Sequence, residues 1–195
     1  TDVTVDRSLT VHSPEEMKQA DVTKLIVQKG TYIDLTTSGS MLVAGKTRSG
    51  KTTAVIALLM QILMFGPDKH GSEVMIIDPK QAELSRLPHT YTLDEDGEAR
   101  GILEAVNRYA KMISIRQQYL NELSERRGDA VKWWDAGLHP SVLFLDEYIS
   151  LRTNLPKRAS KEEPNYSLDE FDGAIRRIVT MGASAGCYVI ISIAE

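Results

Sequence analysis

Residues 45–52, with the sequence GKTRSGKT, constrain this chain more than any other stretch. They match the Walker A pattern G-x-x-x-x-G-K-[ST], in which glycines let backbone N–H groups surround phosphate oxygens. Lys51 supplies a positive charge for the β- and γ-phosphates, and the Thr52 hydroxyl is a ligand suited to Mg²⁺. Apolar runs at residues 41–44 and 54–65 flank the loop. They predict a short buried strand entering a phosphate-binding loop, and a helix leaving it with its N-terminus directed at the anion.

Composition narrows the class of protein. The chain has 195 residues, 42% of them hydrophobic and 26% charged, and a net charge of −4. These values are typical of one globular domain with a full core. A single cysteine, Cys187, excludes an internal disulfide and fits a reducing compartment, so we expect a cytoplasmic protein with a buried thiol. Because the chain begins at Thr1 and stops after a strand-like run, we expect it to be part of a longer protein.

Strands and helices alternate along the rest of the chain. Apolar runs predict strands at residues 32–35, 74–77, 88–92, 142–145 and 189–191. Helical spacing of apolar residues predicts helices at residues 98–126 and 169–181. The continuous apolar strands indicate a parallel sheet covered on both faces. The chain is therefore predicted to adopt a three-layer α/β fold with a mainly parallel sheet.

Two segments are less regular. Ser-Pro-Glu-Glu at residues 13–16 is a typical helix start and predicts a helix to about Val27. Residues 152–167, rich in charge and proline, predict a mobile loop. We divide the chain into an N-terminal lead-in at residues 1–36 and a P-loop domain at residues 37–195.

The second half of the predicted site is a Walker B element, in which Asp146 and Glu147 directly follow an apolar strand. The carboxyl end of a central parallel strand lies where ligands bind. We expect Asp146 to hold Mg²⁺ beside Thr52, and Glu147 to orient and deprotonate the attacking water. The predicted catalytic residues are Lys51, Asp146 and Glu147, and the predicted metal ligands are Thr52 and Asp146. The residues predicted to bind ATP are Gly45, Lys46, Thr47, Arg48, Ser49, Gly50, Lys51, Thr52 and Thr53.

Missing motifs separate the classes of P-loop protein. The chain has no N-K-x-D motif, which argues against a GTPase, and no L-S-G-G-Q motif, which argues against a transporter-type ATPase. An acid directly after Asp146, and a strand between the phosphate-loop strand and the Asp146 strand, favour a hydrolysing RecA-like ATPase. A nucleoside or small-molecule kinase stays open as an alternative.

Further blocks point to a family. They are residues 41–45, the IDPK of residues 77–80 followed by Glu83 and Leu84, residues 87–89, the LFLDEYISL of residues 143–151, and residues 175–191. In these blocks the chain resembles the motor domain of the FtsK/SpoIIIE family of DNA translocases. The resemblance implies ATP hydrolysis coupled to pumping double-stranded DNA, and a homo-oligomeric ring, commonly a hexamer, with ATP between subunits. It also implies membrane anchoring by regions outside this chain.

The chain departs from the family pattern at several positions. Lys46 and Arg48 stand where the family has small residues, and Ala183 and Ala194 replace a family Arg and a polar residue, usually Gln. We therefore favour a divergent member, such as a coupling ATPase of a conjugative or other mobile element, over a chromosome-segregation motor. Two alternatives stay open: an ATP-binding scaffold with weak or no hydrolysis, and a secretion-type ATPase.

The remaining candidates have competing interpretations. Lys157, Arg158 and Lys161 are candidates for phosphate contacts with DNA, or are a solvated loop. For Trp133 and Trp134, packing is favoured over stacking on bases. An arginine finger at Arg176 or Arg177 and a solvated helix face are both open. Asp78 has either a structural or a catalytic role. The four histidines have no metal-ligand spacing.

Overall fold

The computed structural model describes residues 13, 15, 21–46 and 49–194. At its centre is a five-stranded sheet in the order β3-β7-β6-β4-β5. All four pairings are parallel. The strands are β3 (Met41–Gly45), β4 (Val74–Ile77), β5 (Thr90–Tyr91), β6 (Ser141–Leu145) and β7 (Cys187–Ala194). The predicted α/β fold with a mainly parallel sheet is confirmed.

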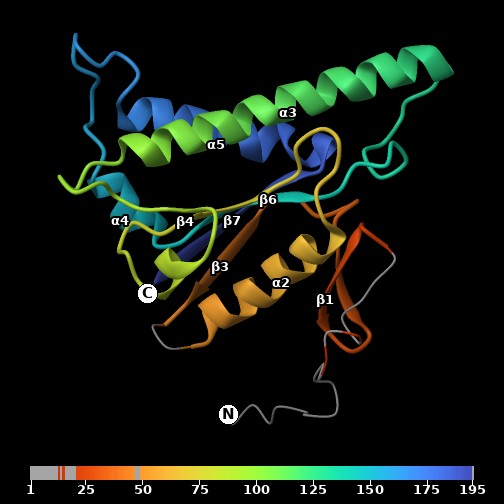
Figure 1. Ribbon diagram of the computed structural model, residues 1–195, viewed down its shortest axis with the longest axis horizontal. Coiled ribbons are helices and arrows are strands. Elements are labelled where there is room, and N and C mark those ends of the chain that lie inside the picture. The colour runs from red at the N-terminus through yellow and green to blue at the C-terminus, as the bar shows by residue number, and fades with distance from the viewer. Residues whose placement is uncertain (1–12, 14, 16–20, 47–48, 195) are drawn as a thin grey trace.

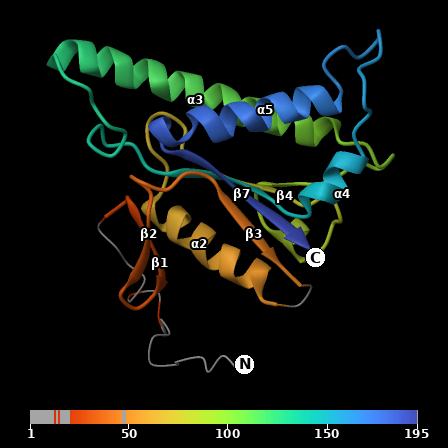
Figure 2. The same cartoon turned by 180° about the vertical axis from the view of Figure 1, so that it is seen from behind.

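Helices cover both faces of this sheet (Figures 1 and 2). On one face lies α2 (Lys51–Phe65), and on the other lie α3 (Arg100–Arg127) and α5 (Leu168–Met181). Alternate side chains of the central strands point to opposite faces. Phe144 of β6 packs in the α2 cluster, whereas its neighbours Leu143 and Leu145 pack in the α3/α5 cluster. The three predicted layers are therefore present, and the helices predicted at residues 54–65, 98–126 and 169–181 begin and end within three residues of the observed bounds.

Strand β3 differs from its prediction as a buried strand. It is at the edge of the sheet, and β7 is its partner. Met41 and Val43 pack in the α2 cluster, but Leu42 on the opposite face is 65% exposed. The apolar run predicted burial on both faces, and this was wrong because α2 covers one of them.

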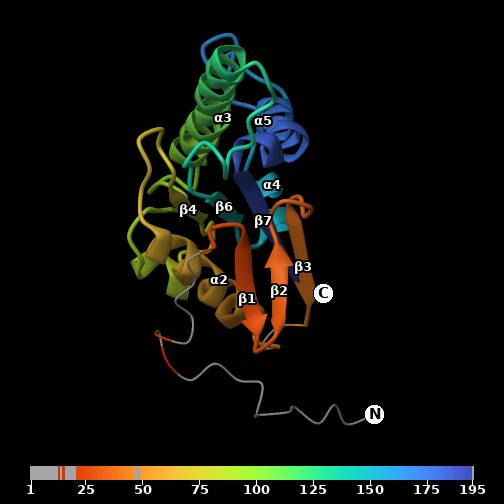
Figure 3. The ribbon, with the colours of Figure 1, turned by 90° about the vertical axis from the view of Figure 1, so that its right-hand side faces the viewer.

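The predicted helix to Val27 is also wrong over its last residues. Residues 14 and 16–20 lie outside the described part of the chain, and Lys24–Gln28 form strand β1. Strand β1 pairs antiparallel with β2 (Thr31–Asp34), and this hairpin packs beside α2 (Figure 3). The buried Gln61 side chain of α2 accepts from the Ile26 N–H at 2.6 Å and donates to its carbonyl at 2.9 Å. These tertiary bonds outweigh the local helix signal.

Shorter elements complete the domain. They are η2 (Glu83–Arg86), α4 (Tyr148–Thr153) and η3 (Ala183–Ala185). The predicted mobile loop therefore begins inside α4, and its later part is tied to α3, since Arg100 Nε donates to Glu163 at 2.5 Å. Within the part of the chain that the structure describes, no helix has the length and apolar character to cross a membrane.

Candidate nucleotide site at the carboxyl edge of the sheet

The carboxyl ends of β4 and β6 bring two acids together. Ile77 pairs with Leu145 in the register of these strands, so the residues that follow, Asp78 and Asp146, lie side by side. The Asp146 N–H donates to the Ile77 carbonyl at 3.0 Å, which continues the ladder to the edge of the sheet. The sequence predicted this edge for Asp146, and the structure confirms its position.

The phosphate loop leaves from the same edge. The register of β6 and β7 sets Asp146 level with Ser192, and Ser192 pairs with Val43 of β3. Two interstrand spacings of about 4.8 Å each therefore separate Asp146 from β3. The loop begins at Gly45, two residues beyond Val43. The acids after β6 consequently lie in one region with the described residues of the loop, 45–46 and 49–53.

The described residues of the loop, 45–46 and 49–50, form part of an anion cradle. Gly50 has φ 86°, which favours glycine, and α2 begins at the next residue with no side-chain cap and no acid in its first turn. A Cβ at Gly45 would lie 3.2 Å from the Ser49 Oγ, so the turn is packed closely around its glycine. The first N–H groups of an α-helix have no partner within the helix, and together with the helix dipole they favour a phosphate at this end.

The Lys51 ammonium lies over this cradle. Its Nζ donates to the carbonyl oxygens of Gly45 and of Lys46, the latter at 3.2 Å. Thr52 is half-buried beside it, whereas Lys46, Ser49 and Thr53 are exposed. Of the predicted ATP-binding residues, Thr47 and Arg48 lie outside the described part of the chain. The other side chains and backbone groups fit a nucleotide phosphate.

The negative charge of the Asp146 carboxylate has few groups nearby that stabilise it. Burial raises the pKa of its carboxyl group, a hydrogen bond from the Ser192 hydroxyl lowers it, and the charges of Asp78 and Glu147 raise it again. Among the described residues, Asp146 has no ion-pair partner within 4.0 Å. A hard oxygen ligand in this state fits a divalent cation such as Mg²⁺. The sequence did not indicate Ser192, whose hydroxyl is the neutral partner.

Glu147 has an unusual backbone. It adopts φ 51° and ψ 46°, the left-handed region, at the N-cap of α4. Such a conformation costs a non-glycine residue on the order of 1–2 kcal/mol and is frequent at functional sites. The Glu147 Oε2 lies 3.2 Å from the Lys80 Nζ, an ion pair that the sequence did not predict.

Asp78 has a structural position. It is fully buried, and its two carboxylate oxygens accept from the N–H groups of Lys80 at 3.2 Å and Ala82 at 2.8 Å. These bonds close the turn after β4, which supports the structural interpretation of this residue.

The other candidates are spread over the surface. Lys157, Arg158 and Lys161 are exposed in the loop after α4, and Arg176 and Arg177 are exposed on α5. Trp133 is 1% exposed and packs in the α2 cluster, so its predicted packing role is confirmed.

A charged cluster at the opposite edge was missed. Arg116 of α3 is fully buried and donates to the Asp68 Oδ2 at 2.9 Å, the Ala185 carbonyl at 2.6 Å and the His139 carbonyl at 2.7 Å. These partners precede β4, β7 and β6. A signal existed, since Arg116 lies three and four residues from Ile113 and Leu120 on the apolar stripe of its helix.

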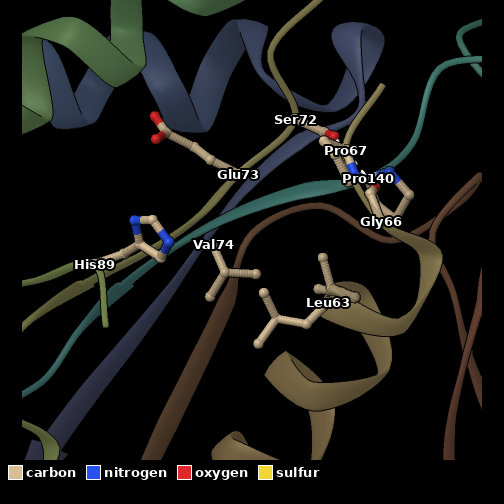
Figure 4. Close-up of a pocket in the computed structure, with 9 residues that line it drawn as sticks. Leu63, Gly66, Pro67, Ser72, Glu73, Val74, His89 and Pro140 are labelled. Atoms are coloured by element: carbon tan, nitrogen blue, oxygen red, sulfur yellow. Dashed lines mark hydrogen bonds between the residues drawn. The ribbon is translucent and has the colours of Figure 1, made fainter. Parts of the chain in front are cut away.

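A cavity also lies at this opposite edge (Figure 4). It has a volume of about 280 Å³ and is lined by Leu63, Val74, His89 and Pro140 among others. Val74 begins β4 and Asp78 follows its end, so this cavity and the phosphate loop belong to opposite ends of the strands.

Comparison with known proteins decides the family. Residues 6–144 match the model of the FtsK/SpoIIIE family. The chain belongs to the FtsK/SpoIIIE family. It is 25% identical over 152 residues to the Ftsk domain-containing protein YdcQ of Bacillus subtilis (strain 168), covering 77% of this chain and 28% of that protein. It is 28% identical over 180 residues to the DNA translocase FtsK of Helicobacter pylori (strain J99), and this match covers 87% of this chain and 19% of that protein.

A solved structure shows the same fold for this FtsK/SpoIIIE chain. The pCW3 conjugation coupling protein TcpA, in its monomer form with ATPγS, is similar with a TM-score of 0.65 and 18% identity. The match covers 95% of this chain and 51% of that one. The chain thus shares its fold with TcpA, and the family match confirms the resemblance expected from the sequence. The chain spans less than a third of the two curated relatives described above.

Proposed function

We propose that this FtsK/SpoIIIE domain binds MgATP on residues 45–53 and hydrolyses it to drive a motor that moves double-stranded DNA. One observation carries the proposal. The uncapped N-terminus of α2, the poorly compensated Asp146 and the strained Glu147 share one edge of the sheet. An anion site, a cation ligand and a water-activating carboxylate at one edge suit phosphoanhydride hydrolysis.

Each residue has one role in this proposal. When ATP binds, the Lys51 ammonium leaves the carbonyl oxygens of Gly45 and Lys46 and contacts the β- and γ-phosphates. The Thr52 hydroxyl and Asp146 hold Mg²⁺, which supplies charge neutralisation at the phosphate oxygens. Glu147, whose side chain is 29% exposed, orients the attacking water and accepts its proton. Because Lys46 is exposed beside the loop, its charge adds to the attraction for phosphate.

The names of the relatives support the DNA cargo. The Helicobacter pylori relative is named a DNA translocase, and TcpA a conjugation coupling protein. We therefore infer DNA transfer or chromosome segregation as the process, with Lys157, Arg158 and Lys161 contacting DNA phosphates without reading sequence. The full-length protein is inferred to form a homo-oligomeric ring, hexameric in the family pattern, in the cytoplasm or at the cytoplasmic face of a membrane.

The test is ATP turnover by the full-length protein, with and without duplex DNA at low salt. We expect duplex DNA to stimulate turnover, and Glu147→Gln to lower it by about 10²–10⁴-fold, the contribution typical of a general base. Glu125→Gln, at an exposed position near the end of α3, is the matched control and keeps wild-type turnover.

Three results would contradict the proposal. Full turnover in Glu147→Gln removes the assigned base. If duplex DNA neither binds to the protein nor stimulates its turnover, the result favours the secretion-type ATPase, whose cargo is protein. Nucleotide binding without turnover under any condition favours the ATP-binding scaffold that Ala183 and Ala194 suggested.

A further inference from the structure

The Lys80–Glu147 ion pair joins two rigid turns. On the Lys80 side, the buried Asp78 carboxylate accepts from the Lys80 and Ala82 N–H groups, and Gln81 at φ 52° donates its side-chain Nε2 to the Leu93 carbonyl at 3.1 Å. The turn after β4 is therefore bound both to its own carboxylate and to the segment that follows β5. The backbone from which the Lys80 side chain projects is consequently fixed.

Glu147 is fixed in the same way on the other side. It follows β6, whose register with β4 brings the two turns together, and it caps α4 in a left-handed conformation. The N–H of Leu151 donates to its carbonyl at 3.1 Å, so the first turn of α4 maintains this backbone. One Glu147 oxygen, Oε2, contacts the Lys80 ammonium at 3.2 Å.

Stability does not explain this contact. The two side chains are 52% and 29% exposed, and ion pairs this accessible contribute little to folding. The contact instead occupies an oxygen of the carboxylate that the proposed reaction needs. A carboxylate held by an ammonium on one oxygen is not free to turn toward a water over the phosphate loop.

We propose that Lys80 is a positioning residue that restrains Glu147 when no nucleotide is bound, and that the pair opens when MgATP fills the site. This inference rests on the proposed function, because it assigns Lys80 an effect on the proposed base. Unstimulated turnover is then low because Glu147 is held aside. Lys80 connects the IDPK turn after β4 to the chemistry after β6.

The first test is turnover by full-length Lys80→Met. Its unstimulated turnover rises about twofold to fivefold over wild type, the largest factor that an exposed pair supplies, while DNA-stimulated turnover changes less. Binding of a fluorescent ATP analogue stays within twofold of wild type on the order-of-magnitude scale of such pairs. Lys80→Arg restores the low unstimulated rate, because it restores the cation. Lys111→Met, which removes an exposed cation on α3, leaves both rates unchanged.

The second test needs no turnover. A carbodiimide joins an amine to a carboxylate only where they touch, so the wild-type protein without nucleotide yields a Lys80–Glu147 cross-link, detected by mass spectrometry. Adding Mg²⁺ and a non-hydrolysable ATP analogue lowers this yield several-fold. The Lys24–Asp21 pair, 3.4 Å apart in the hairpin region, is the reference and keeps its yield.

The outcomes separate this inference from the function beneath it. Both results together support the restraint. A cross-link yield that nucleotide leaves unchanged, or Lys80→Met turnover no higher than wild type, overturns it. The proposed function fails by a different observation, when wild-type protein shows no turnover with duplex DNA or when Glu147→Gln keeps it.

Discussion

The two edges of the sheet carry charge in opposite ways. At the amino edge, the Arg116 guanidinium is fully buried, and every nitrogen of it has a partner in Asp68, Ala185 or His139. At the carboxyl edge, Asp146 is half-buried with Ser192 as its hydrogen-bonding side chain and two further acids nearby. The buried charge at the amino edge is fully paired, whereas at the carboxyl edge Asp146 has no ion-pair partner among the described residues.

The amino edge therefore stabilises the fold, whereas the carboxyl edge is suited to bind a ligand. A buried ion pair with all its hydrogen bonds made is costly to break, because removing one partner strands the other. A carboxylate whose pKa is raised by burial is instead poised for a cation. Substitutions at the amino edge should therefore lower stability, and substitutions at the carboxyl edge should mainly change activity.

The largest effect is expected for Arg116→Met. The substitution keeps the length of the side chain but leaves the Asp68 carboxylate, 3% exposed, without its cation. We expect the free energy of unfolding to fall by about 3–5 kcal/mol, measured by urea denaturation. Arg126→Met, at an exposed position on the same helix, is the control and changes it by less than about 0.5 kcal/mol. A loss below about 1 kcal/mol for Arg116→Met would show that this edge does not hold the fold.

Asp68→Asn tests the same cluster through pH. Burial alone raises the pKa of the Asp68 carboxyl, but the N–H groups of His139 and His70 and the charge of Arg116 lower it below the usual 3.8. A lowered pKa means stability that is present above pH 3.8 and is lost as pH falls through the folded-state value.

Wild type is therefore expected to exceed Asp68→Asn by about 2–3 kcal/mol near pH 7, and the difference shrinks below about pH 4. Urea denaturation at several pH values measures it. A difference that stays constant down to acid pH would assign the effect to shape rather than to charge.

The carboxyl edge was the predictable part of the molecule. A phosphate loop is a local pattern, because its glycines, Lys51 and Thr52 are adjacent in sequence. The alternation of apolar runs and helical spacing fixed the order of strands and helices, and two acids after a central strand located Asp146 and Glu147. Pairing between the parallel strands then brings the phosphate loop and the two acids to one edge of the sheet, whatever the conformation of the connecting loops.

The amino edge was not predictable, because its contacts join residues far apart in sequence. Arg116 and Asp68 are separated by 48 positions, and Gln61 reaches Ile26 across 35. Local propensity carries no information about such pairs. For the same reason, a helix was predicted up to Val27 where the structure has strand β1. The Lys80–Glu147 pair was missed for the same reason, although Glu147 had been assigned to the right edge.

Asp146→Asn should have opposite effects with and without ligand. Without nucleotide, removing a half-buried charge near two other acids raises the free energy of unfolding by roughly 0.5–1 kcal/mol. With Mg²⁺ and ATP analogue, wild type gains about 2.7 kcal/mol at a hundredfold excess over Kd, and the variant gains less. Thermal denaturation with and without Mg²⁺ and the ATP analogue measures both effects, and Asp129→Asn, at an exposed position, is the control. A variant that is less stable without ligand would mean that Asp146 holds the fold, as Asp68 does.

The smallest effect on stability is expected for Lys80→Met. Like Arg116→Met, this substitution removes one positive charge, but at the carboxyl edge of the sheet. The Lys80 ammonium is 52% exposed and has water as an alternative partner, so we expect a change below about 0.5 kcal/mol in the free energy of unfolding. A double-mutant cycle with Glu147→Gln, measured by urea denaturation, should give a coupling of about 0.2–1 kcal/mol. A loss above about 2 kcal/mol would place this pair in the same class as Arg116–Asp68 and end the distinction between the edges. A small loss combined with faster unstimulated turnover would separate them, since the Lys80 charge would then act on the reaction without holding the fold.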